Sequence, residues 1–254
     1  MTAAFIAVVL LRKPVRFEKA DVKALVSDLP PRSLPFLHNF DDAGDKISIH
    51  LDDQAFAILA TDQPVPRSDV AHELDRPGNE ALAEAFDSHT AHLLVVCRLP
   101  AAEMGVALMA ATGVHLLAHR LGALGDPVAV TWASSMRTER WDTFADLTAP
   151  LIRVYDNEPA FPSRYWVSIQ ITQDSKKFGG ETKGLNPLTG YKLSMTPVDW
   201  PIEDVAARLV GIVQYLMENG PVLEDGQTFG ASEEERFRIA LDGEVMRLEL
   251  EGQG

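Results

Sequence analysis

Two similar stretches, AFIAVVLLRKP at residues 4–14 and AHLLVVCRLP at residues 91–100, decide how this sequence is interpreted as a fold. Each begins with alanine, has Val-Val at its centre and ends with an arginine followed two residues later by a proline. Apolar runs of this length are typical of strands that are covered on both faces. A helical pattern follows each of them. The pair therefore predicts that one structural unit occurs twice in the chain.

The first half continues with a recognisable series of elements. Apolar residues at helical spacing predict a helix over residues 18–29, which ends before Pro30. The segment KISIHLD alternates apolar and polar residues, as a half-buried strand does, and AFAILAT at residues 55–61 returns as its hairpin partner across an Asp52-Asp53 turn. Helical segments at 68–74 and 79–87 lead into the second copy.

The second half begins in the same order. A helix is expected over residues 101–121, a strand over 128–132 and, after a long connection, a strand over 164–173. Both halves thus give the β-α-β-β order of a ferredoxin-like βαββαβ unit. The chain ends in an amphipathic helix after Trp200-Pro201 and a β-hairpin that turns at Asp242-Gly243. The predicted fold class is α+β, with a tandem repeat of ferredoxin-like units, a C-terminal helix and a hairpin.

No Gly/Ser-rich linker separates these elements, so residues 1–254 are expected to form a single compact unit. The alternative is a boundary near residues 150–163, which would divide the chain into residues 1–150 and 151–254.

The charge balance restricts the partners that the protein can have. With 23 basic and 37 acidic residues, the net charge of -14 argues against nucleic acid as the main ligand, because that affinity depends on Lys and Arg. It suits a basic protein partner. A composition of 46% hydrophobic and 24% charged residues is typical of a soluble globular protein.

Membrane insertion and export are not expected. No apolar run approaches the ~20 residues that cross a bilayer. The N-terminus has neither a basic segment before its apolar stretch nor a small-residue cleavage site. The single cysteine, Cys97, excludes an intramolecular disulfide framework, and its apolar strand predicts a buried, unreactive thiol. We therefore expect a cytoplasmic protein.

Four histidines form two closely spaced pairs. His89 and His92 stand at the start of the second apolar strand, and His115 and His119 share one face of the following helix. The second pair has the spacing of zinc-protease helices, but Leu116 replaces their general-base glutamate. The two pairs could converge on a metal ion. Separate structural roles are the preferred interpretation, and no cofactor is expected.

Two glycine-rich segments are the remaining candidates for a site. DSKKFGGETKGLNPLTGY at residues 174–191 is predicted to be a surface loop, and it lacks the lysine of a phosphate loop. DGQTFG at residues 225–230 has the composition of tight turns. The candidate functional positions in these segments are Thr182, Gly184, Asp225, Gly226, Thr228 and Gly230.

Five stretches together resemble a known family. They are AVVLLRKP, PVPRSD at residues 64–69, HTAHLLV, ETKGLNPLTGYKLSM and NGPVLEDGQTFG. The chain resembles the bacterial proteins grouped as domain of unknown function 4261, although its ETKG-NPLTG spacing departs from the family pattern. The resemblance implies a soluble bacterial protein and no established activity, with the motif positions as candidate sites.

Two functions remain open. The first is a non-enzymatic protein-protein interaction or accessory factor of the immunity type, whose acidic surface masks a basic partner. The second is a small-ligand-binding protein or hydrolase-like enzyme in which the glycine-rich turns meet His89 or His92, with Asp225 or a histidine as general base. Because no complete catalytic constellation is present in the sequence, we expect the first. The partner and the oligomeric state are left open.

Overall fold

The computed structural model describes residues 2–27, 36–38, 46–51, 54–100, 103–153, 161–230 and 235–251. The chain divides into two compact units, Met1–Pro162 and Ser163–Gly254. The boundary lies at the end of the 150–163 segment. The expected turn at Asp52-Asp53 and the end of the first expected helix lie outside the described residues.

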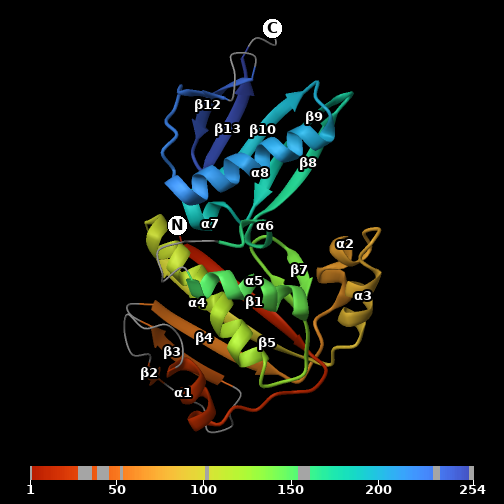
Figure 1. The fold of residues 1–254 in the computed structure, drawn as a ribbon, viewed down its shortest axis with the longest axis vertical. Helices are drawn as coiled ribbons and strands as arrows, with labels where there is room; N and C mark the ends of the chain where they lie inside the picture. Colours follow the sequence, from red (N-terminus) through yellow and green to blue (C-terminus); the bar gives the residue numbers. More distant parts are fainter. Residues whose placement is uncertain are drawn as a thin grey trace. The chain divides into compact units, whose positions relative to one another are not determined.

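The first unit is built on a seven-stranded sheet with the order β2-β3-β4-β5-β1-β6-β7, in which neighbouring strands are antiparallel (Figure 1). Its strands are β1 (Thr2–Leu11), β2 (Phe36–His38), β3 (Lys46–Leu51), β4 (Gln54–Thr61), β5 (Ala91–Pro100), β6 (Pro127–Trp132) and β7 (Arg137–Arg140). Its helices are α1 (Lys19–Ser27), η1 (Arg67–Asp69), α2 (Ala71–Leu74), α3 (Glu80–Asp87), α4 (Met104–Gly122) and α5 (Trp141–Arg153).

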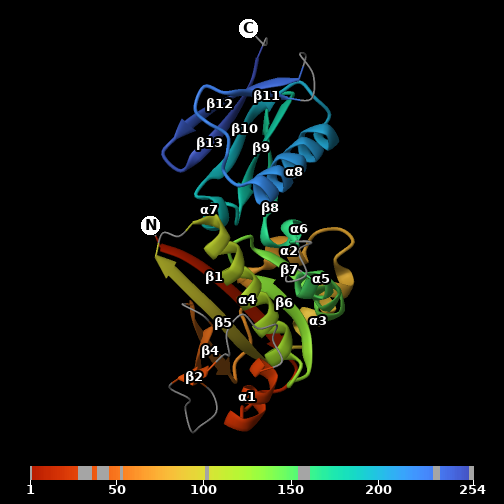
Figure 2. The same cartoon turned by 60° about the vertical axis from the view of Figure 1, so that its left-hand side comes forward.

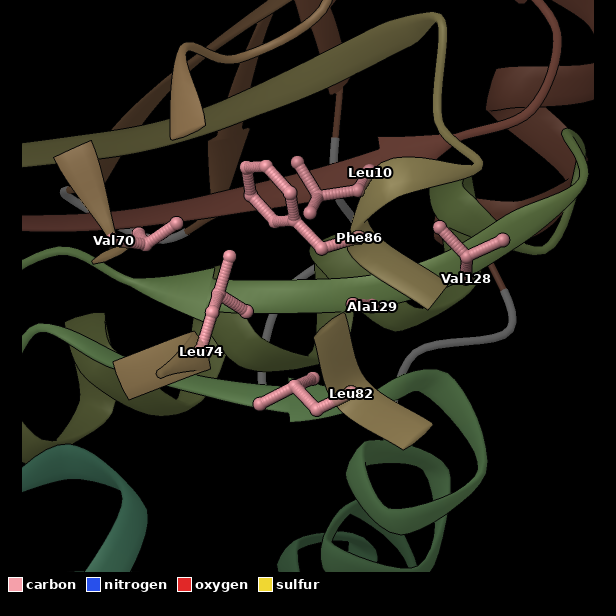
Figure 3. Packing of buried hydrophobic residues seen from close by; sticks show 7 residues of the cluster. All are labelled: Leu10, Val70, Leu74, Leu82, Phe86, Val128 and Ala129. Carbon is pink, nitrogen blue, oxygen red and sulfur yellow. The ribbon is translucent and has the colours of Figure 1, made fainter. Parts of the chain in front are cut away.

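Helices lie on both faces of this sheet. α4 packs along β1 and β5, with α1 and α5 beside it (Figure 2). Val9 faces α4, because a Cβ at Gly122 would come within 2.9 Å of its side chain. The next residue, Leu10, points to the opposite face, as the alternation of a strand requires. There it joins a buried cluster contributed mainly by α2, α3 and β6 (Figure 3). The members of the cluster are Leu10, Val70, Leu74, Leu82, Phe86, Val128 and Ala129.

The two similar stretches are neighbours in this sheet. β1 and β5 run antiparallel, with Ala4 opposite Arg98 and Leu11 opposite Ala91. They are therefore central strands of one unit and do not begin two successive copies. Their sequences are alike because strands covered on both faces have the same need for small and branched apolar residues.

The βαββαβ order occurs once among the described residues. β1, α1, β4, β5, α4 and β6 follow one another in that order, and their strands are arranged β4-β5-β1-β6 in the sheet. The β2–β3 segment and the α2–α3 segment are inserted into it. The second unit has a different strand order, so it is not a copy of the first. The α+β class is as expected. The two sheets do not form the expected tandem repeat of ferredoxin-like units, because their strand orders differ.

α4 has the length and composition of a helix that can cross a membrane, which the search for apolar runs in the sequence missed. In the structure, 67% of its apolar 18-residue window is buried. Its apolar character is accounted for by burial between the sheet, α1 and α5.

The second unit is a six-stranded sheet with the order β11-β12-β13-β10-β9-β8. β10 and β13 are parallel, and the chain between them contains α8, β11 and β12, while the other neighbouring pairs are antiparallel. Its strands are β8 (Ser168–Asp174), β9 (Lys177–Lys183), β10 (Lys192–Val198), β11 (Thr228–Gly230), β12 (Arg236–Asp242) and β13 (Val245–Leu250). Its helices are α6 (Ser163–Trp166), α7 (Asn186–Thr189) and α8 (Ile202–Asn219).

α8 lies across one face of this sheet, and its buried stripe packs on β8 and β9 (Figures 1 and 2). The expected C-terminal helix and the hairpin at Asp242-Gly243 are both confirmed. Gly243 has a φ of 59°, which glycine adopts in tight hairpin turns without steric cost.

Two predictions for the start of the second unit were wrong. Residues 163–166 form α6, so the strand expected over 164–173 begins only at Ser168. The segment predicted to be a surface loop contains β9 and α7. The strand pattern of β9 is hidden by Gly179 and Gly180, which tertiary contacts require: a Cβ at Gly180 would lie 2.6 Å from Leu209 of α8.

Candidate functional site

His89 is a buried residue held on both sides of its ring. Its Nε2 accepts a hydrogen bond from the Val65 amide at 2.8 Å. Its Nδ1 therefore carries the proton and donates to the carbonyl oxygen of Phe86. The ring also packs edge-on against Phe86, with centroids 4.6 Å apart. These contacts fasten the end of α3 to the segment before η1, and they occupy both nitrogens that a metal or substrate would need.

The two histidine pairs lie on opposite faces of the first sheet. His92 stands directly opposite Leu10 in the β1–β5 register, so both side chains point to the α2–α3 face. Its Nδ1 donates to the Gln63 carbonyl oxygen at 2.7 Å. His115 and His119 belong to α4 on the other face. The structure therefore does not bring the four imidazoles together. Within the described ranges, no group of three or more His, Cys, Asp or Glu side chains is placed to hold a metal ion.

His115 and His119 are parts of an aromatic core. The His115 ring stacks on Phe144 of α5 at 4.2 Å, and the His119 ring stacks on Trp141 at 5.4 Å. Thr148 Oγ1 donates to the Phe144 carbonyl oxygen and accepts from His115 Nε2 at 3.1 Å. Complete burial, with a smaller contribution from His119, lowers the pKa of His115 to about 3. Burial also lowers the pKa of His119. Both rings are neutral packing groups at physiological pH.

Cys97 lies in the middle of β5 and is fully buried, as expected from its strand. Burial raises the pKa of its thiol to about 11. Since the thiolate is the reactive form, this side chain is an inert part of the core at neutral pH.

Thr182 and Gly184 have structural roles at the end of β9. The Thr182 hydroxyl is buried, accepts a hydrogen bond from the Leu193 amide at 2.9 Å and donates to the Leu193 carbonyl oxygen at 3.4 Å. It thereby joins β9 to β10. Gly184 has a φ of 88°, which favours glycine at the turn that follows the strand.

The second glycine-rich segment is a turn that docks on β12. Asp225 Oδ1 accepts from the Leu241 amide at 2.8 Å, and the Gly226 amide donates to the Ile239 carbonyl oxygen at 2.8 Å. Thr228 begins β11, opposite Arg238. A Cβ at Gly230 would lie 1.8 Å from the Glu235 carbonyl oxygen, so no other residue fits there without a backbone shift.

The two glycine-rich segments are not brought together. Thr182 lies in β9 and Thr228 in β11, and three strands stand between them. Four strand spacings correspond to about 19 Å. His89 and His92 belong to the first unit, whereas both turns belong to the second.

Sequence reasoning missed a buried ionic cluster in the first unit. The Glu73 carboxylate of α2 is only 3% exposed and contacts Arg76 at 3.0 Å and Arg137 of β7 at 3.1 Å. Arg137 also contacts Glu139 at 3.3 Å. Burial raises the pKa of Glu139, with Arg137 opposing the effect and Glu73 adding to it. The cluster ties α2 to the edge strand of the sheet. No sequence signal marks it, because the pairing is made by residues about 64 positions apart.

A hollow of about 450 Å³ lies in the first unit where α3 faces the start of α5. Arg12 and Arg140 line it, but each is already paired with an acid, Asp126 at 3.2 Å and Asp142 at 2.5 Å. Its positive charges are thus compensated by their own neighbours.

A second hollow is a groove in the second unit, with a volume of about 640 Å³. One wall is α8, and the other is formed by β11 and the start of β12. We call it the α8–β11 groove. Its lining residues are Trp200, Asp204, Ala207, Arg208, Gly211, Ile212, Tyr215, Phe229, Gly230 and Glu235.

Aromatic rings form the floor and ends of the groove. Phe237 of β12 is fully buried beneath it and packs against Trp200 at 5.6 Å and Phe229 at 6.3 Å. Tyr215 stands at the other end of α8 with 42% of its surface exposed. Across the groove, the Arg208 guanidinium is paired with the Glu235 carboxylate. The groove therefore combines an apolar floor with charged edges.

Of the positions selected from the sequence, only Gly230 lines this groove. The α8 wall carries a weak sequence signal that could have been used. Ala207 and Gly211 are small residues on the solvent side of an amphipathic helix, where long charged side chains are usual. The other wall is lined by Phe229, Gly230 and Glu235, whose position beside α8 depends on the strand order.

A comparison with known protein families matches part of the chain. No curated protein and no solved structure matches the chain. The model of the family described as Domain of unknown function (DUF4261) matches residues 181–249. The matched segment contains the ETKGLNPLTGYKLSM and NGPVLEDGQTFG stretches and every residue that lines the α8–β11 groove. Residues 181–249 of this chain are thus similar to the domain of unknown function 4261 family, the family that the short stretches of sequence resemble.

Proposed function

We propose that this protein is a non-enzymatic interaction protein, an accessory factor of the immunity type, which binds a basic protein partner in the α8–β11 groove. The observation that carries the proposal is an open groove lined by three aromatic side chains, Trp200, Tyr215 and Phe229. Aromatic residues dominate the binding energy of protein interfaces because they bury a large area with little loss of side-chain freedom.

The openness of the groove favours a polypeptide over a small molecule. Its α8 wall is exposed at Asp204, Ala207, Gly211 and Tyr215, and Gly230 is exposed on the other wall. A small-molecule site generally buries most of the ligand surface. A shallow groove of this kind can instead be covered by a longer chain segment that makes contacts on both walls.

Charge supports a basic partner. Among the described residues that line the groove, Arg208 is paired with Glu235 and Asp204 adds a further negative charge, and the chain as a whole has a net charge of -14. A partner that carries Lys or Arg is attracted over long range and finds acceptors at the rim.

A capture experiment with matched glycine variants tests the proposal. The full chain is immobilised and incubated with native lysate, and bound proteins are quantified for the wild type, Gly211→Gln and Gly105→Gln. Both glycines are exposed helical positions where an added Cβ meets nothing within 4 Å, so both variants are expected to fold. Only Gly211 lines the groove.

We expect a basic protein that is retained by the wild type and by Gly105→Gln and is reduced at least about tenfold by Gly211→Gln, the loss that is typical of filling an interface centre. A partner retained equally by all three proteins would place the interaction elsewhere. Retention of no protein at low or moderate salt would contradict the proposed function.

A further inference from the structure

We propose that the occupant of the α8–β11 groove is an amphipathic helix of the partner, which lies beside α8 on the same face of the sheet and directs a basic side chain toward Asp204. This inference rests on the proposed function and identifies the chemistry of the partner segment.

The sheet of the second unit is wider than the helix that covers it. Six strands span about 24 Å between the outer strand axes, and a helix with its side chains is about 10 Å wide. α8 packs on β8 and β9, at one side of the sheet. Over β11 and β12, the apolar face carries Phe229 and Phe237. The groove thus lies on the helix-bearing face, beside the part of the sheet on which α8 packs.

The α8 wall has the periodicity and length of a helix-packing surface. Its lining residues lie at positions 204, 207 and 208, 211 and 212, and 215, so that each turn of the helix contributes one or two of them at a spacing of three or four residues from the last: Asp204, Ala207, Arg208, Gly211, Ile212 and Tyr215. Because the rise is 1.5 Å per residue, this stripe is roughly 16 Å long, or about three turns. A helix lying along it, outside the Arg208–Glu235 ion pair, can contact the exposed members of the stripe, Asp204, Ala207, Gly211 and Tyr215.

Gly211 allows close approach at the centre of the stripe. A glycine inside a helix costs about 1 kcal/mol relative to alanine. Within the chain itself nothing requires this cost, because a Cβ at Gly211 meets nothing within 4 Å. A neighbouring helix would fill the space that a side chain would otherwise occupy, since small residues let two helix axes approach to about 8 Å.

The charges favour a basic residue on this helix. Arg208 is paired with Glu235, whereas Asp204 makes no ion pair with any cation in the described part of the chain. Glu203 is exposed beside it. A Lys or Arg near the end of the partner helix that passes Trp200 would meet these carboxylates, while apolar residues of the helix fill the space between Tyr215 and Phe229.

A strand is the competing occupant, since β11 is the edge of the sheet. β11 contains only three residues, Thr228–Gly230, so an added strand could make few backbone hydrogen bonds with it. It would also leave the α8 stripe uncontacted. The helix uses both walls of the groove and is therefore the better fit.

The test is selection from a displayed library of random peptides of about 16 residues, a little over four helical turns. The library is selected against the full-length wild-type chain. Enriched peptides are then measured against the wild type, Gly211→Gln, Tyr215→Ser and the control Gly105→Gln. We expect enriched sequences with apolar residues at intervals of three and four, and at least one Lys or Arg. We expect their affinity to fall at least about tenfold in both groove variants and to be unchanged in Gly105→Gln.

Each other outcome has a defined meaning. Groove-dependent peptides with alternating apolar residues, or with acidic residues in place of basic ones, would overturn the helix proposal and leave the interaction function standing. Peptides that bind Gly211→Gln and Tyr215→Ser as tightly as the wild type would overturn the groove as the site. No enrichment of any peptide would overturn the helix proposal, and no enrichment together with no partner in the lysate experiment would contradict both proposals.

Discussion

Single residues in the second unit show how the same amino acid can be required at one position and replaceable at another. Gly180 of β9 faces α8, and its lack of a side chain makes room for Leu209. Gly211 of α8 faces open space. Both are small for different reasons: the first for packing within the chain, the second, by our proposal, for packing with a partner.

The two glycines are expected to respond to alanine in opposite ways. Gly180→Ala places a Cβ 2.6 Å from Leu209 Cδ1 and 3.1 Å from the Gln170 carbonyl oxygen, and this overpacking should lower the free energy of unfolding by about 1–3 kcal/mol. Gly211→Ala should raise it by about 0.5–1 kcal/mol through helix propensity. Urea-induced unfolding of the wild type and the two variants measures both changes. A stabilised Gly180→Ala variant would show that β9 and α8 are not packed as described.

His115 should make the first unit sensitive to acid. Its folded pKa of about 3 lies below the ordinary value of 6.5. Above pH 6.5 the imidazole is neutral in both states, so it contributes no pH dependence. Between these values the unfolded chain binds a proton that the folded chain does not, and stability falls as pH falls. From about pH 7 to about pH 5 the loss should be roughly 2 kcal/mol.

The measurement is urea-induced unfolding at these two pH values for the wild type, His115→Phe and, as a control, Gly105→Gln. His115→Phe removes the titrating group and keeps a ring against Phe144. The number of protons taken up on unfolding should therefore fall by about one, and the pH dependence of the free energy of unfolding should weaken accordingly. Gly105→Gln changes an exposed position of α4 without adding or removing a titratable group, so it should leave the dependence as it is in the wild type. An unchanged dependence in His115→Phe would mean that this imidazole is accessible to protons in the folded state.

At the scale of elements, short segments are held in place by side-chain bonds that their own sequences do not indicate. α2 has only four residues, too few for a helix that is stable alone. Glu73 fastens it to β7 through Arg137, and Asn79 Nδ2 donates to the Glu73 carbonyl oxygen at 2.7 Å. The apolar cluster around Leu74 completes this attachment (Figure 3).

Removal of the Glu73 charge should therefore loosen α2. Glu73→Gln leaves Arg137 at the edge of the core without its buried carboxylate, and we expect a loss of about 3 kcal/mol in the free energy of unfolding, at the low end for buried pairs because both arginines retain contact with water. Glu84→Gln on the exposed side of α3 is the matched control and should change stability by less than about 0.5 kcal/mol. Chemical denaturation provides the comparison. Equal effects of the two variants would show that the Glu73 pairs contribute nothing to stability.

At the scale of the whole molecule, the chain combines two units of different strand order with a net charge of -14. Only the second unit contains the family segment and the α8–β11 groove. The acidic residues are spread over the sequence and attract a basic partner over long range. The groove contributes short-range contacts only once the partner is bound. The proposed interaction should therefore have a salt-dependent and a salt-independent part.

Capture of the basic partner should weaken as salt increases. Raising the ionic strength from about 0.1 M to about 1 M shortens the Debye length from about 10 Å to about 3 Å, which screens the attraction between the net charges. Retention of the partner is measured over this range, with a neutral sugar at matched osmolality as the control. Retention that increases with salt would indicate an interaction driven by the aromatic floor alone.

Local patterns in the sequence determined the elements whose apolar residues follow one clear period. The helix at Ile202–Asn219, the hairpin at Asp242-Gly243 and the strands at residues 4–11 and 91–100 could all be predicted, because their burial depends on the alternation within the segment itself. The burial of Cys97 followed from the same pattern. The family resemblance of residues 181–249 was also carried by short stretches of sequence.

Tertiary structure alone decided the strand order, the hidden strand and the groove. Two alike strands can begin two units or lie side by side in one, and only their pairing distinguishes these cases. β9 is a strand because Gly179 and Gly180 fit beneath α8 and against β10, contacts that the alternation of a single segment does not record. The α8–β11 groove is formed by residues 200–235 on separate elements. Long-range packing, which joins residues distant in sequence, places them on facing walls.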